Sequence, residues 1–232
     1  VHPDRWPGLA IDAGETVGSV VRQVFGTSEA RSPLWTERSL WRELVVLRVS
    51  FDDVKAAAKE HGVSINDLAV KAVADAVAKN PEVNSSFADD TVTIYEDVNV
   101  SVAMATEQGL VVPVVKNAER KTAREIGSEI RELQERAAAG QLTSEDLSGG
   151  TITVSNLGFY GVETGTPIIN PPQSCMVFVG SIRRVAVAGE GDEIRVAPVL
   201  ELSIAYDHRF IDGMTASRFT TGLKEELENI SP

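Results

Sequence analysis

Cysteine is almost absent from the 232-residue sequence, which contains only Cys175. A single cysteine cannot form an intrachain disulfide, which fits a reducing compartment, so we expect a cytoplasmic protein. Cys175 lies in an apolar run typical of a buried strand, and burial raises the pKa of a thiol. We therefore expect a structural role for it. With only three histidines and no spacing typical of ligands, the sequence predicts no metal site.

Long apolar runs and an excess of positive charge are also missing. No stretch approaches the roughly 18 apolar residues that a membrane helix needs, and no signal-peptide pattern opens the chain. The formal net charge of −12 argues against nucleic-acid binding, which requires a basic surface. An anionic ligand would need a local group of cations, for which Arg183, Arg184 and Lys116 are the candidates.

What is present is a mixture of helical and strand patterns. The apolar spacing and turn signals predict helices at about 52–61, 64–80 and 122–140, with a last helix from about residue 213. They predict strands at 44–50, 91–106, 110–117, 151–156, 174–180, 182–188, 194–197 and 199–206. Because helices and strands do not alternate strictly, the fold class is expected to be α+β. Residues 1–35 are expected to be a divergent N-terminal segment, and residues 36–232 one catalytic domain.

The most informative stretch is Tyr206–Gly213, which separates the last predicted strand from the last predicted helix. His208 lies at this strand end between two carboxylates, where a histidine can be held rigidly and still meet a ligand. Such a histidine can take a proton from a thiol or hydroxyl group and return it later. The alternative is a structural histidine in an ion-pair network. His61, at a predicted helix end, is given no role.

Residues 207–213 read D-H-R-F-I-D-G, which resembles the active-site motif of the dihydrolipoyl acyltransferases. These are the catalytic domains of 2-oxo acid dehydrogenase complexes and belong to the chloramphenicol acetyltransferase-like superfamily. Three further blocks resemble the same family in the same order: G-L-V-V-P-V-V at 109–115, G-G-T-I-T-V-S-N-L-G at 149–158 and T-P-I-I-N-P-P-Q at 166–173. The resemblance runs from about residue 44 to the end of the chain.

The resemblance implies a mixed β-sheet packed with helices, in a homotrimer. It implies transfer of an acyl group between the thiols of coenzyme A and dihydrolipoamide, with His208 as the general base. Ser155 matches the serine that stabilises the oxyanion, and Asp212 matches an acid that orders the site beside His208. In this family the histidine and the serine come from neighbouring subunits. Asp207 and Arg209 are expected to form a structural ion pair.

The implied partners are the other components of a 2-oxo acid dehydrogenase complex. The lipoamide is expected to come from a lipoyl domain that is not present in this chain.

Two alternatives stay open. One is a stand-alone coenzyme A-dependent acyltransferase of the same fold that uses an alcohol, an amine or a carrier-bound thiol as acceptor. The other is a non-catalytic core or scaffold protein. The motifs do not distinguish acetyl, succinyl and branched-chain acyl groups.

Overall fold

The structure is a computed structural model of the chain. It describes residues 42–51, 55, 58–59, 62–88, 91–107, 109–188 and 193–229. The predicted N-terminal segment and His61 lie outside these residues, as does most of the helix predicted at 52–61. No helix in the described ranges is long and apolar enough to cross a membrane.

A six-stranded mixed sheet forms the centre of the described fold, with the strand order β1-β10-β9-β8-β4-β7. Strand β8 is parallel to its neighbours β4 and β9, and the other neighbouring pairs are antiparallel. The strands of this sheet are β1 Arg42–Ser50, β4 Val100–Val102, β7 Val114–Val115, β8 Ile152–Asn156, β9 Cys175–Ala188 and β10 Ile194–Asp207. Two small antiparallel pairs lie outside it, namely β2 Ser85–Ala88 with β3 Thr91–Ile94, and β5 Met104–Thr106 with β6 Gly109–Val111.

The two longest strands differ from the sequence prediction, because each was predicted as two shorter strands. Strand β9 continues through Gly180 and Ser181, and β10 continues through Pro198. Pro198 is tolerated because it lies just past the end of β1, where its carbonyl accepts from the Phe51 amide and no ladder bond needs a proline N–H. A register shift between Leu200 and Leu202 marks an irregularity in the β9–β10 pairing.

Three α-helices are described, and their starts follow from side-chain caps. Helix α3 (Ile65–Lys79) begins with a reciprocal capping box between Ser64 and Asp67, and α4 (Ala123–Ala138) begins with the same arrangement between Thr122 and Glu125. Helix α5 spans Gly213–Glu228. The sequence prediction of these helices is confirmed. Short 3-10 turns occur at η3 Pro81–Val83, η4 Ala118–Arg120 and η5 Gly158–Tyr160.

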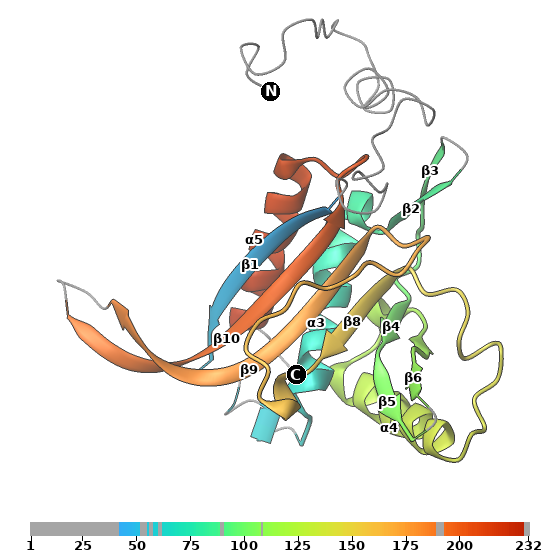
Figure 1. Cartoon of the computed structure of the whole chain (residues 1–232), viewed down its shortest axis with the longest axis horizontal. Helices are drawn as coiled ribbons and strands as arrows, with labels where there is room; N and C mark the ends of the chain where they lie inside the picture. The colour runs from blue at the N-terminus through green and yellow to red at the C-terminus, as the bar shows by residue number, and fades with distance from the viewer. Residues whose placement is uncertain are drawn as a thin grey trace, which may run out of the picture.

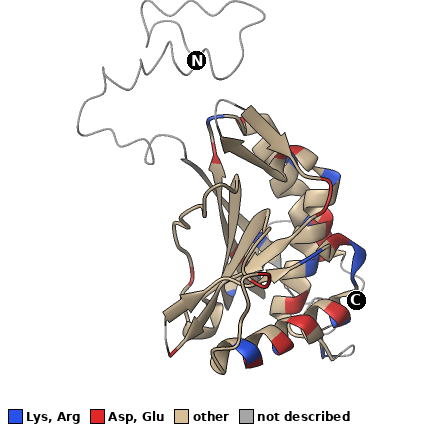
Figure 2. Cartoon of the chain, turned by 90° about the vertical axis from the view of Figure 1, so that its right-hand side faces the viewer, with Lys and Arg blue, Asp and Glu red and all other residues tan. Residues whose placement is uncertain are grey.

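The helices pack on one face of the sheet, and the segment from residue 157 to 173 crosses the other face (Figures 1 and 2). Successive side chains of β10 point alternately to these two faces of the sheet. The Tyr206 hydroxyl lies 2.7 Å from Thr220 of α5, whereas the Ser203 hydroxyl lies 3.2 Å from Thr164 of the crossing segment. The core therefore fills the space between the sheet and the helices, and side chains on the opposite face meet the 157–173 segment.

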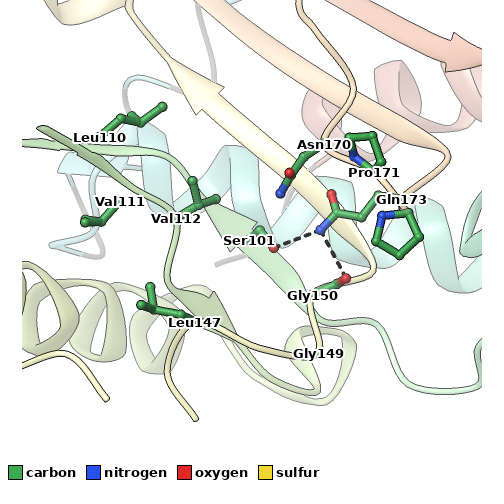
Figure 3. Close-up of a pocket in the computed structure, with 11 residues that line it drawn as sticks. Ser101, Leu110, Val111, Val112, Leu147, Gly149, Gly150, Asn170, Pro171 and Gln173 are labelled. Atoms are coloured by element: carbon green, nitrogen blue, oxygen red, sulfur yellow. Dashed lines mark hydrogen bonds between the residues drawn. The ribbon is translucent and has the colours of Figure 1, made fainter. Parts of the chain in front are cut away.

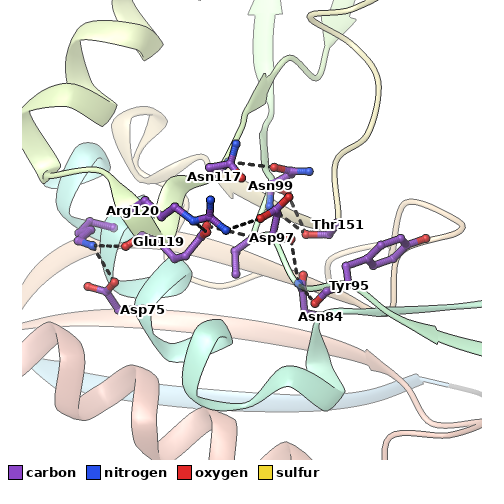
Figure 4. A network of polar contacts seen from close by, with 11 residues as sticks. Asp75, Asn84, Tyr95, Asp97, Asn99, Asn117, Glu119, Arg120 and Thr151 are labelled. Carbon is purple, nitrogen blue, oxygen red and sulfur yellow. Dashed lines mark hydrogen bonds and ion pairs between the residues drawn. The ribbon is translucent and has the colours of Figure 1, made fainter.

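A polar network fixes the approach to β4 (Figure 4). The side-chain oxygen of Asn99 accepts from the Asn117 amide at 2.9 Å, and the Asn99 amide donates to the Thr151 hydroxyl at 3.1 Å. Asn84, which is almost fully buried, donates to the carbonyls of Tyr95 and Asp97. These bonds tie the segments before β4, after β7 and before β8 together. They therefore hold the starts of β4 and β8 in place relative to each other.

Candidate active site

His208 follows β10 directly and is solvent-exposed. The strand end that carries it is held from both sides. The Asp207 amide donates to the Ser174 carbonyl at 2.7 Å, and the Ile211 amide donates back to the Asp207 carbonyl at 3.1 Å. The chain therefore turns at a fixed point immediately after β10, and the exposed His208 lies at this turn.

Asp207 and Arg209, on either side of the histidine, form the ion pair that the sequence predicted. The Arg209 Nε lies 2.9 Å from Asp207 Oδ1, and its Nη2 lies 2.5 Å from Oδ2. The guanidinium also lies 4.6 Å from the centre of the Phe87 ring, which stacks on Phe210. The pair thus joins the strand end to the β2–β3 hairpin, and this structural prediction is confirmed.

Asp212 is the N-cap of helix α5. Its carboxylate accepts from the Thr215 amide at 2.8 Å, and this hydrogen bond lowers the pKa of the Asp212 carboxyl group. The sequence analysis placed Asp212 beside His208 as an ordering acid but overlooked its capping role. This capping residue, four residues after the histidine, fixes where the last helix begins.

Replacing Asp212 with alanine should lower the free energy of unfolding by about 1 kcal/mol at pH 7, because the α5 cap is lost. Folding lowers this pKa, so the carboxylate's contribution is complete above the unfolded pKa of about 4 and is lost as pH falls through the folded pKa. The difference between the two proteins should therefore shrink in acid. Asp212→Asn keeps a capping oxygen and serves as the control. Urea unfolding between pH 3 and 7 tests this, and a pH-independent difference for Asp212→Ala would contradict it.

Ser155 is the penultimate residue of β8 and is partly buried. Among the residues that the structure describes, no protein group is hydrogen-bonded to its hydroxyl. Alternation along β8 places it on the same side as Thr153, whose hydroxyl bonds Gln173 in the segment before β9. Ser155 therefore lies on the face of the sheet opposite the helices.

Ser155 and His208 do not meet within one chain. Ser155 pairs with Phe178 of β9, which pairs with Ser203 of β10, and His208 follows Ser203 by five residues. At roughly 3.3 Å per residue and about 4.8 Å between strands, the two are about 19 Å apart. A reaction that uses both side chains must therefore take one of them from another chain.

A pocket of about 380 Å³ lies beside the starts of β8 and β9 (Figure 3). Its floor is polar: the buried Gln173 amide donates to the Ser101 hydroxyl at 3.1 Å and to the Gly150 carbonyl at 3.0 Å. Apolar side chains, Leu110 and Leu147 among them, form its walls. Sequence reasoning missed this pocket, although three of the four family-like blocks line it.

The three candidate cations are not gathered at one place in the chain. The Arg183 Nη1 atom lies 2.9 Å from Glu163 Oε1, and the Lys116 Nζ atom lies 3.5 Å from Glu145 Oε1. Arg183 and Arg184 belong to the distal half of β9, whereas Lys116 follows β7, the edge strand three positions away in the sheet. Their role in binding coenzyme A stays a prediction. Within the described residues, no group of His, Cys, Asp or Glu side chains is placed to hold a metal ion.

Cys175 is fully buried at the start of β9. Burial raises the pKa of its thiol far above the normal range. The expected burial of Cys175 in a strand is confirmed.

The described fold is similar to that of chloramphenicol acetyltransferase, with a TM-score of 0.53 at 17% identity over 81% of this chain and 88% of that one. A probable dihydrolipoamide acetyltransferase from Listeria monocytogenes is more similar, with a TM-score of 0.75 at 33% identity over 82% and 85% of the two chains. The dihydrolipoamide acetyltransferase of Azotobacter vinelandii has a TM-score of 0.75 at 30% identity, covering 82% of each chain. A serine, a histidine and an asparagine of that enzyme were investigated for their roles in its catalytic mechanism.

The sequence comparisons agree. The model for the 2-oxoacid dehydrogenases acyltransferase (catalytic domain) matches residues 33–232. The dihydrolipoyllysine-residue acetyltransferase component of the pyruvate dehydrogenase complex from Rickettsia bellii is 39% identical over 180 residues, which are 78% of this chain and 42% of that protein. The chain thus spans less than half the length of this relative. It belongs to the family of 2-oxoacid dehydrogenase acyltransferase catalytic domains, and the predicted family and α+β fold class are confirmed.

Proposed function

We propose that the chain is the catalytic domain of a dihydrolipoyl acyltransferase, which moves an acyl group between coenzyme A and dihydrolipoamide. The observation that carries the proposal is the placement of His208, exposed at a strand end that the ion pair and backbone bonds hold fixed. The matched relatives are named as acetyltransferases, which makes acetyl the first acyl group to test. The parent complex would then supply the lipoyl domain and the other components.

His208 would act on the attacking thiol. A thiol has a pKa of about 8.5, so only a minority is ionised at neutral pH and a base is needed. The imidazole takes the S–H proton, and the sulfur attacks the thioester carbon to form a tetrahedral oxyanion. The oxyanion collapses, the bond to the departing sulfur breaks, and that sulfur takes the proton back from His208. Atoms and charge balance without any further reactant.

Ser155 would donate its hydroxyl to the tetrahedral oxyanion. The absence of a described protein partner leaves this partly buried hydroxyl available to a ligand. Losing one such donor typically costs about 3 kcal/mol of barrier. Asp212 occupies the position four residues after His208, which is also the spacing of the asparagine from the histidine studied in the Azotobacter vinelandii enzyme. Its proposed contribution is to set the start of α5, and thereby the turn that carries His208.

The separation of Ser155 and His208 supports an assembly in which neighbouring chains complete each site. A cyclic trimer satisfies this requirement with three identical sites, and we propose the homotrimer as the active unit. Arg183, Arg184 and Lys116 are proposed to meet the phosphates of coenzyme A in this assembly. The cytoplasmic location expected from the single cysteine stays a prediction.

The acceptor decides between this function and a stand-alone acyltransferase. With acetyl-coenzyme A as donor, the purified assembly should acetylate dihydrolipoamide with a kcat/KM at least about 100-fold above that for alcohol or amine acceptors of similar size. Release of free coenzyme A, followed with a thiol-insensitive coupled assay, measures the rate. Preference for an alcohol or amine would indicate the stand-alone alternative. No turnover with any acceptor would indicate the scaffold alternative.

A further inference from the structure

The turn that follows Ser155 is anchored by a contact with the helical layer. Asn156, the last residue of β8, donates from its side-chain nitrogen to the side-chain oxygen of Asn66 at 3.1 Å. Asn66 is the second residue of α3, is buried and lies 90 residues earlier in the chain. The capping box between Ser64 and Asp67 fixes this helix end, so Asn66 is a rigid reference point.

The orientations of both amides follow from their hydrogen bonds. The Asn156 side-chain oxygen accepts from the Gly158 amide at 3.0 Å, and a backbone N–H can only donate. The Asn156 nitrogen must therefore face Asn66, and Asn66 must present its oxygen. Asn156 thus bridges the start of α3 and its own turn.

The other side of the turn packs backbone against backbone on β9. The Leu157 amide donates to the Val179 carbonyl at 3.2 Å. A Cβ atom at Gly158 would lie 2.3 Å from the Gly180 carbonyl oxygen, and one at Gly180 would lie 2.0 Å from the Glu163 carbonyl oxygen. Two glycines therefore permit a contact that no side chain would allow.

Successive residues of a strand point to opposite faces of the sheet, so Asn156 reaches the helices while Ser155 points to the other face. We infer that Asn66 and Asn156 are positioning residues, which hold the end of β8 so that the Ser155 hydroxyl stays aligned with the developing oxyanion. This inference rests on the role proposed for Ser155. It assigns neither asparagine a contact with substrate.

Replacing Asn66 with leucine, which has the same branching but no acceptor, should lower kcat about 10- to 100-fold and change KM little, since the alignment matters in the transition state. Asn66→Asp keeps an acceptor oxygen for Asn156 in the first turn of a helix, where a negative charge is favourable, and should retain kcat within about 3-fold. Asn80→Leu is the matched control. Asn80 bonds the Ala76 carbonyl at the opposite end of the same helix, so its loss should reduce thermal stability and leave kcat unchanged.

The test combines these variants with Ser155→Ala. If Asn66 acts through Ser155, Asn66→Leu should change kcat by less than about 2-fold in the Ser155→Ala background. An equal loss in both backgrounds, or an unchanged kcat for Asn66→Leu beside a collapsed Ser155→Ala, would overturn the positioning role alone. An unchanged kcat for Ser155→Ala would overturn the oxyanion role in the proposed function, and the positioning role with it. Thermal unfolding of each variant confirms that kcat is compared between folded proteins.

Discussion

Replacing His208 with glutamine should lower kcat for acetyl transfer to dihydrolipoamide by about 10²- to 10⁴-fold, the usual contribution of a general base. Glutamine is of similar size and polarity but cannot take a proton from a thiol. The strand end should keep its shape, because the Asp207–Arg209 pair and the Asp207–Ser174 backbone bond do not involve the imidazole.

The same change at His61, a histidine that the sequence gives no role, provides the control and should leave kcat within about 2-fold. If His208 supplies the base, raising the pH toward the thiol pKa of about 8.5 should recover part of the lost rate in His208→Gln, because more thiolate then forms without a base. A His208→Gln protein that keeps its assembly and full turnover would contradict the assignment.

Mixing two inactive variants should restore activity. If one site uses both Ser155 and His208, the distance of about 19 Å between them in one chain requires that the site combine two chains. An assembly that contains both Ser155→Ala and His208→Gln chains includes sites in which the intact serine of one chain meets the intact histidine of another. For random 1:1 mixing, about a quarter of the sites in a cyclic assembly are intact in this way.

The two variants are co-expressed, or unfolded and refolded together, so that both chains enter the same assembly. A chain that carries both changes, mixed with unmodified chain at the same ratio, is the matched control. In this control mixture a site is intact only when both chains that form it are unmodified. The fraction of intact sites should therefore be similar in the two mixtures. Recovery in the control without recovery in the variant mixture would place both side chains in the same subunit and contradict the distance.

Local patterns in the sequence predicted the parts of the fold that depend on neighbours along the chain. Helices α3 and α4 begin at the cap residues Ser64 and Thr122, each of which precedes an acid by three residues, and both form capping boxes in the structure. The Asp207–Arg209 pair is likewise a contact over two residues. The Asp212 cap could also have been predicted, because an aspartate precedes the last apolar stripe. It was overlooked because Asp212 belongs to the family-like motif and was interpreted only as an active-site residue.

Features that depend on pairing between distant segments were not predictable in this way. The continuity of β10 through Pro198 depends on where β1 ends, and the bond between Asn66 and Asn156 joins residues 90 apart. The placement of Ser155 relative to His208 follows from the register of three strands, β8, β9 and β10. Charge alone does not decide where a ligand binds either, since Arg183 and Lys116 each lie near an acidic side chain, and their binding role stays a prediction.

The most direct test of the proposed function is steady-state transfer from acetyl-, succinyl- and isobutyryl-coenzyme A to free dihydrolipoamide by the unmodified assembly. We predict turnover with one preferred donor, and that donor identifies the acyl group of the parent complex. A folded assembly that transfers none of the three acyl groups to dihydrolipoamide would contradict it.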